Sequence, residues 1–217
     1  MGDSWLQRLV VRGPASEVTA FRSAAASREK PEYWTVEPAC RTQKLSFAKL
    51  RNLLPHKQAR RFDAELEEPW DLSVDPPRRF KDGSLEVTYR FQLGDSEPDD
   101  LIIAVSRLYP RLCFVVGCVA PNVDEQSSLL VHEGQSWGWH LSARRKEAIW
   151  KERVPEETKD NSDEVTWGLA EADWQMMDEV VAHWRPKMDA LMARVLKKDR
   201  AARRRGPGLS NYGRRAG

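Results

Sequence analysis

The sequence contains little of what most enzymes and membrane proteins need. Its glycines form neither a phosphate-binding loop nor a dinucleotide-binding fingerprint, and no serine lies in a nucleophile elbow. No apolar run approaches the roughly 20 residues that cross a bilayer, and the N-terminus lacks the basic and apolar regions of a signal peptide. Three cysteines, an odd number, argue against a disulfide framework. These absences disfavour an enzyme without excluding one, and they predict a cytoplasmic protein with no membrane partner.

The chain does contain enough apolar material for one principal domain. Of its 217 residues 41% are apolar and nine are tryptophan, whose side chains each bring a large buried area. The net charge is +2, but residues 197–217 hold eight cations and one acid, so this segment stands at +7 and the rest of the chain at −5. The eight cations are Lys197, Lys198, Arg200, Arg203, Arg204, Arg205, Arg214 and Arg215. Such a segment is typical of contact with polyanions or acidic partner surfaces.

The first third of the chain predicts a strand and a helix, followed by an insertion. Residues 4–14 are rich in Val and Leu and end at a Gly-Pro turn, which predicts a strand. Residues 15–28 have apolar side chains at helical spacing. Prolines are frequent in the insertion expected at about residues 30–82, where KLSFAKL (44–50) predicts a short strand and residues 56–70 predict a helix.

The middle of the chain changes its hydrophobic period twice. LEVTYRFQL (85–93) alternates strictly between apolar and polar residues, which predicts a strand with one face in water. Residues 94–110 then place Leu101, Val105 and Leu108 on one stripe of a helix. The apolar run RLCFVVGCV that follows predicts a strand covered on both faces.

A hairpin and helices complete the expected order. The segments 127–133 and 135–141 predict an antiparallel hairpin, and residues 142–154 a short helix. An acidic linker is expected at 154–165 and a long amphipathic helix at 166–205, before a flexible basic tail at 206–217.

The long helix has one apolar face, and Pro186 is expected to bend it. The preferred prediction is that this face packs onto the chain's own domain, because so apolar a helix does not stay exposed. The alternative is an adaptable docking surface for a protein partner. The partner-binding candidates are Trp174, Met177, Trp184 and Met188.

Strand, helix and strand, repeated after an insertion, is the order of a duplicated β-α-β unit. It predicts an α+β ferredoxin-like sandwich over residues 1–153, with an antiparallel sheet extended by the hairpin and followed by the long C-terminal helix. The stretches SWLQRLVVRGP, KLSFAKLRNLLP, LEVTYRFQL, AVSRLYPRLCFVVGCVAP and SSLLVHEGQSWGW resemble those of YubB-type ferredoxin-like proteins of plasmids and phages, over about residues 4–142.

The chain also departs from the pattern of that family. Members usually open with a Trp-Cys-x-Asn-like motif, whereas Trp5 is followed here by LQR, and their Trp-Ser-Pro-Pro turn is replaced by GDSEP. The resemblance implies a fold and a bacterial mobile element as the source. It implies no catalytic residue, and none is assigned.

Two groups of residues are candidate metal sites. Cys113 and Cys118, five positions apart on a strand, point to opposite faces and are interpreted as core thiols. His132 and His140 flank the hairpin turn and could approach one another, with Glu133 as a third ligand, although a strand histidine is more often only that. No metal or cofactor is predicted.

Aromatic and basic residues supply the remaining hints of function. Trp137 and Trp139 share one face of the last strand, where they either seal the sheet against the C-terminal helix or the Trp-rich insertion, or form a stacking platform for bases. The run LCFVVGCV has no basic residue, which disfavours recognition of RNA on the sheet face. The basic tail, with its arginines and a tyrosine, suits phosphate contacts and stacking in a salt-dependent complex.

The leading hypothesis is a non-enzymatic binding protein of a bacterial mobile element. It docks a partner protein or assembly and contacts DNA or RNA through its basic C-terminal arm. One alternative is a small-molecule or metal-binding enzyme domain with a pocket near the 132–140 hairpin. Another is a protein inhibitor or assembly subunit that acts on a host or competing-element complex.

Overall fold

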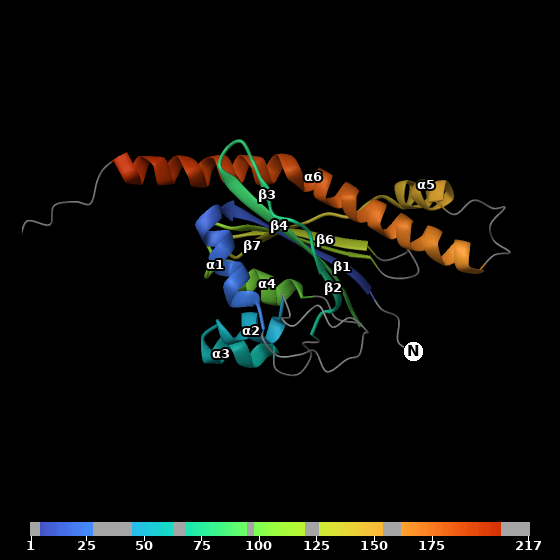
Figure 1. The fold of residues 1–217 in the computed structure, drawn as a ribbon, viewed down its shortest axis with the longest axis horizontal. Helices are drawn as coiled ribbons and strands as arrows, with labels where there is room; N and C mark the ends of the chain where they lie inside the picture. Colours follow the sequence, from blue (N-terminus) through green and yellow to red (C-terminus); the bar gives the residue numbers. More distant parts are fainter. Residues whose placement is uncertain are drawn as a thin grey trace, which may run out of the picture.

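The computed structural model describes residues 5–27, 45–62, 68–94, 98–119, 126–153 and 162–204. It is a mixed α+β fold with an open antiparallel sheet and a long C-terminal helix (Figure 1). The strands are β1 (Trp5–Pro14), β2 (Trp70–Val74), β3 (Arg78–Arg79), β4 (Ser84–Leu93), β5 (Cys113–Val119), β6 (Gln126–His132) and β7 (Gln135–Gly138). The helices are α1 (Ala15–Ala25), α2 (Phe47–Asn52), α3 (His56–Ala59), the 3-10 helix η1 (Arg60–Phe62), α4 (Asp99–Ser106), α5 (Ala143–Arg153) and α6 (Ser162–Arg204).

The sheet has the strand order β2-β4-β1-β5-β6-β7, with β3 paired to the start of β4. All of these pairs are antiparallel. In the centre, Leu9 of β1 lies opposite Tyr89 of β4 and Val116 of β5. Successive side chains of a strand point to opposite faces, so Leu9 and its neighbour Val10 enter different cores.

One face of the sheet is covered by α1, α2 and α4 (Figure 1). The alternate apolar side chains of β4 point toward these helices, and Tyr89 and Phe91 are each 1% exposed. Phe21 of α1 stands edge-on to Tyr89 and Phe114, with ring centroids 6.5 and 5.4 Å apart. This is the larger core, and the strand alternation and the spacing of apolar residues in α1 predicted it correctly.

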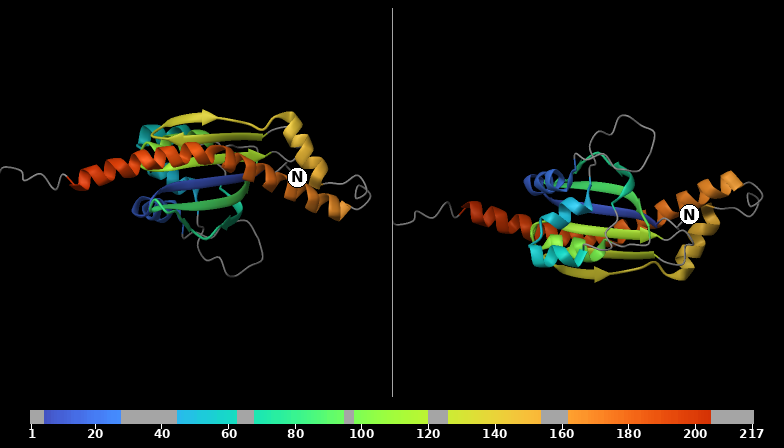
Figure 2. Two further views of the ribbon diagram at one scale, coloured as in Figure 1. Left: turned by 90° about the horizontal axis from the view of Figure 1, so that it is seen from above. Right: turned by 90° about the horizontal axis from the view of Figure 1, so that it is seen from below.

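The opposite face is covered by α6, which runs roughly along the strands (Figures 1 and 2). The strands supply Val10, Val115 and Leu130, and the helix supplies Met and Trp side chains. Pro186 lies inside α6, and the helix changes direction between its orange and red parts (Figure 1). All of β5 is buried between the two layers, as its continuous apolar run predicted.

The expected strand at residues 44–50 is wrong, because α2 begins at Phe47. Ser46 caps this helix by accepting a hydrogen bond from the N–H of Lys49. The Glu68 carboxylate, distant in sequence, accepts from the N–H groups of Phe47 at 3.2 Å and Ala48 at 2.7 Å. These acceptors satisfy the free N–H groups of a helix start, which a local pattern cannot reveal. The next strand after β1 in the described part of the chain is β2 instead.

Four further expectations need adjustment. The polar face of β4 is not fully in water, because α6 covers Glu86 to 5% exposure. Leu108 falls beyond the end of α4 and is exposed rather than part of its buried stripe. The long helix begins at Ser162, within the expected linker, while residues 154–161 and 205–217 lie outside the described part of the chain. Of the helix expected at 56–70, the structure describes only α3 and η1 and then β2 from Trp70.

The hairpin and the helix after it form as expected. The turn between β6 and β7 consists of Glu133 and Gly134, with φ of 52° and 76°. Two residues in the left-handed region are what a tight two-residue hairpin requires. No helix in the described part of the chain is long and apolar enough to cross a membrane.

Candidate functional site

The C-terminal end of α6 extends beyond the sheet and carries exposed cations (Figures 1 and 2). The side chains of Lys197, Lys198 and Arg200 are exposed, and none forms an ion pair within the described residues. Arg194 lies one turn earlier and is also exposed. Of the other predicted cations, Arg203 and Arg204 continue the helix, and Arg205, Arg214 and Arg215 lie outside the described residues.

The single acid in this basic run is directed back to the domain. Asp199 accepts a hydrogen bond from the guanidinium group of Arg111, in the segment between α4 and β5. Arg111 also donates to Glu17 of α1 at 3.0 Å. The paired acid therefore ties the end of α6 to the body of the protein and leaves the neighbouring cations facing solvent.

Farther back, buried arginines of β1 bind α6 to the sheet. Arg8 is 4% exposed and donates to Asp178 of α6 at 2.6 Å. Burial lowers the pKa of Arg8 from its ordinary value, and the hydrogen bond to Asp178 opposes this effect. The guanidinium group also lies 5.4 Å from the centre of the Trp174 ring. The charge is thus held between a carboxylate and an aromatic face.

A second set of charges joins the same layers. Arg12 is 2% exposed and donates to Asp189 of α6 and, at 3.1 Å, to Asp82 before β4. Glu86 of β4 accepts from both terminal nitrogens of Arg185. Sequence reasoning missed these pairs. Its available signal was the presence of two arginines four positions apart, and so on one face, in a largely apolar strand.

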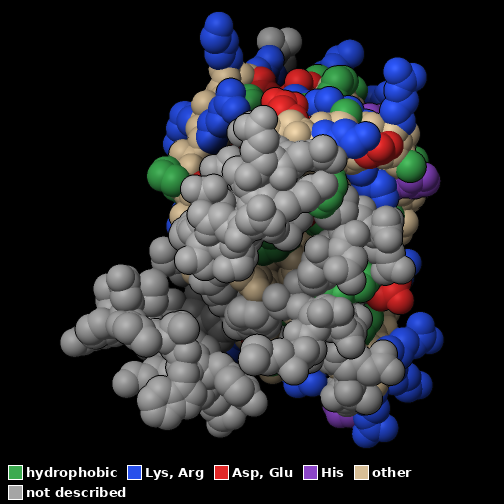
Figure 3. All heavy atoms as spheres, turned by 90° about the vertical axis from the view of Figure 1, so that its right-hand side faces the viewer, with side chains coloured by type: hydrophobic (Ala, Val, Ile, Leu, Met, Phe, Trp, Pro, Cys, Tyr) green, Lys and Arg blue, Asp and Glu red, His purple; other side chains and the backbone are tan. Residues whose placement is uncertain are grey.

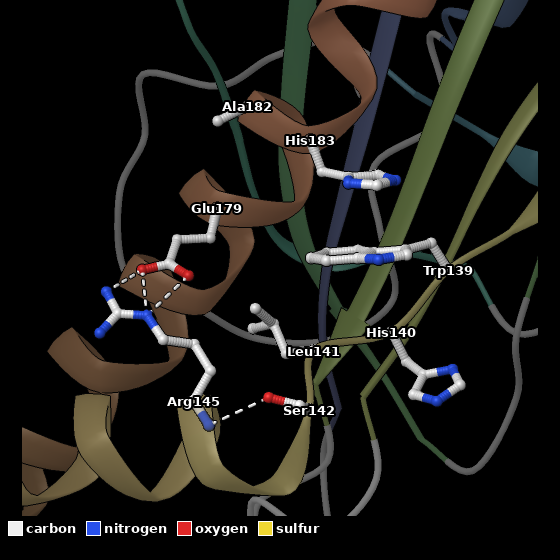
Figure 4. Close-up of a pocket in the computed structure, with 8 residues that line it drawn as sticks. All are labelled: Trp139, His140, Leu141, Ser142, Arg145, Glu179, Ala182 and His183. Atoms are coloured by element: carbon white, nitrogen blue, oxygen red, sulfur yellow. Dashed lines mark hydrogen bonds and ion pairs between the residues drawn. The ribbon is translucent and has the colours of Figure 1, made fainter.

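A groove of about 480 Å³ lies between α6, α5 and the segment after β7 (Figure 4). Trp139 and His183 stack face to face there, with ring centroids 3.9 Å apart and 6° between their planes. At the other end, Nε of Arg145 donates to both carboxylate oxygens of Glu179, at 2.9 and 3.0 Å. The remaining lining residues are His140, Leu141, Ser142 and Ala182.

The polar groups of this groove largely satisfy one another. The Arg145–Glu179 pair neutralises its own charge, and the Ser142 hydroxyl accepts from the N–H of Arg145 at the start of α5 (Figure 4). His183 is covered on one face by Trp139. The groove therefore has stacked aromatic rings beside an ion pair whose two charges cancel. These groups are a weak basis for catalysis.

Trp137 and Trp139 face α6 instead of solvent. Both are half-buried against the helix side of the sheet. Lys187 of α6 lies over Trp137, with its Nζ 3.7 Å from the ring centre, while Trp139 carries His183. The first of the two expectations, that these rings seal the sheet against the C-terminal helix, is what the structure has. A platform for bases would require α6 to leave.

The partner-binding candidates on α6 also point inward. Met177 and Met188 are fully buried, and Trp184 is 5% exposed and donates its indole N–H to Ser128 Oγ at 3.2 Å. Trp174 is half-buried beside the arginines of the sheet. These side chains pack onto the chain's own domain, and a role in binding a protein partner stays a prediction.

His132 and His140 do not come together. The register pairs His132 with Gln135 beside the turn, whereas the N–H of Trp139 binds the carbonyl of Ser128 near the other end of β6. His132 is buried, and its Nδ1 lies 2.9 Å from the carbonyl oxygen of Leu112. His140 is exposed and points away from the rest of the groove (Figure 4). The proposed approach of the two histidines is therefore wrong.

The cysteines of β5 lie in different layers, as predicted. Cys113 packs under α6, and Cys118 accepts a hydrogen bond from Gln7 at 3.2 Å within the sheet. Burial raises the pKa of Cys113 to about 12, so its thiol stays protonated. Among the described residues, no group of three or more His, Cys, Asp or Glu side chains could hold a metal ion.

No protein-family model, curated protein or solved structure matches the chain, so the resemblance to YubB-type proteins stays a prediction.

Proposed function

We propose that this protein binds nucleic acid through the basic C-terminal end of α6. The observation that carries the proposal is the arrangement of charge there. Lys197, Lys198 and Arg200 face solvent, while Asp199, the acid among them, is paired with Arg111. Cations on the solvent side of a helix end can reach phosphates, and the acid among them is already paired with Arg111 and does not compete for them.

The chemistry of these groups favours a polyanion over a single small anion. A guanidinium group binds phosphate oxygens in pairs, and lysine adds a mobile point charge. Neutralising phosphates releases condensed counterions, so affinity falls as salt rises, with a slope of about 0.9 per contact on duplex DNA. The sequence supplies five further arginines after Arg200, which would extend the same contact.

The fold that we propose is a ferredoxin-like sandwich. The order β2-β4-β1-β5, with α1 and α4 on one face, supports it, and β6, β7 and α6 are additions to that unit. RNA-binding domains of this architecture stack bases on the other sheet face. Here α6 covers that face, which supports contact at the helix end instead.

The experiment is a titration of labelled duplex and single-stranded DNA and RNA, followed by fluorescence anisotropy. The test variant is Lys197→Glu/Lys198→Glu/Arg200→Glu. Its control, Lys57→Glu/Arg60→Glu/Arg61→Glu, makes the same change of charge at exposed positions of α3 and η1, on the opposite side of the sheet (Figure 1).

We expect the test variant to lose at least about tenfold in affinity and the control to bind as the wild type does. The salt slope of the test variant should fall by up to about 3, one for each lost contact. Point variants are preferable to truncation after Leu196, because truncation also removes the Arg111–Asp199 anchor. Weak binding that is equal in all three proteins and insensitive to salt would disprove the proposal.

A further inference from the structure

The β3–β4 hairpin carries a second group of exposed cations beside α6. Arg78 and Arg79 form β3, and Lys81 lies in the turn that follows. All three side chains are exposed, and within the described part of the chain none of them forms an ion pair. Figure 3 views the molecule from the right-hand side of Figure 1 and shows Lys and Arg side chains, interspersed with Asp and Glu, along its upper edge, with further Lys and Arg side chains at the lower right.

Two acids next to this hairpin pair with a buried arginine of β1. Asp82 accepts from Arg12 and, through its other oxygen, from the N–H of Ser84 at 2.8 Å. Asp189 of α6 is also paired with Arg12, which is itself buried. The buried arginine thus pairs with both acids and offsets one of their two charges, while Arg78, Arg79 and Lys81 point outward and form no ion pair with either acid.

The hairpin is fixed to α6. Arg12 bridges the turn at Asp82 and the helix at Asp189. The ring of Phe80 has the guanidinium groups of Arg12 and Arg185 at 3.7 and 5.4 Å from its centre. A groove of about 720 Å³ lies between Phe80 and the helix. The hairpin cations and the end of α6 thus keep a constant separation.

This separation suits a regular phosphate backbone. Arg200 follows Asp189 by about three helical turns, so it lies on the face of α6 that meets the hairpin. With a rise of about 1.5 Å per residue, Lys197 and Arg200 lie roughly 12 and 17 Å beyond Asp189 along the axis. Base pairs rise about 3.4 Å each, so the two cation groups are roughly four to five base pairs apart.

Three aromatic rings on this side are already in contact with side chains of the protein. Proteins that bind single strands combine cations with aromatic rings on which bases stack. Within the part of the chain that the structure describes, three rings near α6 each have one face covered by another side chain of the protein. The covered rings and their partners are Phe80 with Arg12, Trp137 with Lys187, and Trp139 with His183. Contact through phosphates alone favours a duplex, whose bases are already stacked.

We infer that the β3–β4 hairpin and the end of α6 bind one nucleic-acid duplex at two points along its backbone. The inference rests on the proposed function and adds the ligand class and the second contact. The hairpin binds phosphates at one point, the helix end binds them about half a helical turn farther along, and neither reads the base sequence.

The test uses the full chain with the substitutions Arg78→Glu/Arg79→Glu/Lys81→Glu, alongside the helix-end variant and the α3 control described above. A milder variant, Arg79→Gln/Lys81→Gln, keeps the contact of Arg78 with Phe80 in case the charge reversal disturbs folding. Thermal unfolding of each protein shows whether it is folded. The probes are a short duplex, a second duplex of scrambled sequence and one of the single strands.

We expect the hairpin reversal to lower duplex affinity at least about tenfold and to reduce the salt slope by up to about 3. The milder variant should reduce the slope by up to about 2. The two duplexes should bind alike, and the single strand at least about tenfold more weakly. If only the helix-end variant loses affinity, or if the single strand binds as well as the duplex, the inference is wrong and the proposed function stands. If the wild type does not bind in a salt-dependent way, the proposed function itself fails.

Discussion

Asp173 gives α6 a predicted sensitivity to pH. It lies on the helix between Ala172 and Met176, members of an apolar cluster that also includes Ile149 of α5. The residue is 7% exposed, and its Oδ1 has no hydrogen-bond partner among the described residues. Burial raises the pKa of Asp173 to about 7, because the charged form is poorly solvated there. The substitution Asp173→Asn removes this charge at almost constant shape.

The change in the free energy of unfolding follows from the shift in the pKa of Asp173. The pKa rises from 3.8 to about 7, and each unit corresponds to about 1.4 kcal/mol. Between these two values the unfolded chain has released the proton and the folded protein still holds it, so the free energy of unfolding falls as pH rises. Above pH 7 the loss is complete, at about 4 kcal/mol. Below the ordinary carboxyl pKa it vanishes.

The measurement is urea unfolding followed by tryptophan fluorescence at several pH values. We expect Asp173→Asn to match the wild type near pH 4 and to be more stable by up to about 4 kcal/mol at pH 8. Other carboxylates contribute their own pH dependence to both proteins, and this cancels in the difference. Glu152→Gln, at an exposed position of α5, is the control and should stay within about 0.5 kcal/mol of the wild type.

Two results would refute this reasoning. A stability difference between Asp173→Asn and the wild type that does not change with pH would mean that Asp173 titrates alike in the folded and unfolded chains. A variant that is less stable than the wild type at pH 8 would mean that the carboxylate has a favourable partner in the folded protein. Either outcome would contradict the loss of stability that we attribute to burial of the charged Asp173 carboxylate.

Two other predictions concern the contact between β5 and α6. A Cβ atom at Gly117 would lie 2.9 Å from Sδ of Met177, so Gly117→Val should lower the free energy of unfolding by about 1–3 kcal/mol in the same urea assay, and unchanged stability would contradict this close contact. With Cys40 and Cys118 replaced by serine, Cys113 should react with a thiol reagent only after unfolding, because burial holds the pKa of Cys113 near 12, and rapid labelling of the folded protein would show that α6 does not cover it.

Much of the fold was predictable because it is encoded by local periodicity. The strict alternation of LEVTYRFQL places Tyr89 and Phe91 in the larger core, and the apolar run before Val119 becomes the fully buried β5. The spacing of Trp and Met residues in the last third predicted a helix with one apolar face. In each case the signal spans only a few turns or alternations of one segment.

The failures involve partners that are distant in sequence. The helix α2 depends on Glu68, which binds its first N–H groups from outside the segment. The separation of His132 and His140 depends on the register of β6 and β7, and the position of Asp199 depends on Arg111. Residue types alone predicted the cations at the end of α6. They could not predict that buried Arg12 pairs with the acids beside a second basic group.

The layer that α6 forms on the sheet also sets an order of events during synthesis. Every strand in the described part of the chain leaves the ribosome before this helix does, so the apolar face with Val10, Val115 and Leu130 has no cover until α6 has been made. Likewise, the ion pairs of Arg8 with Asp178 and of Arg12 with Asp189 form only after α6 has been synthesised. The nascent protein therefore passes through a stage in which this apolar surface is exposed. At that stage, chaperone binding and premature self-association compete with correct folding.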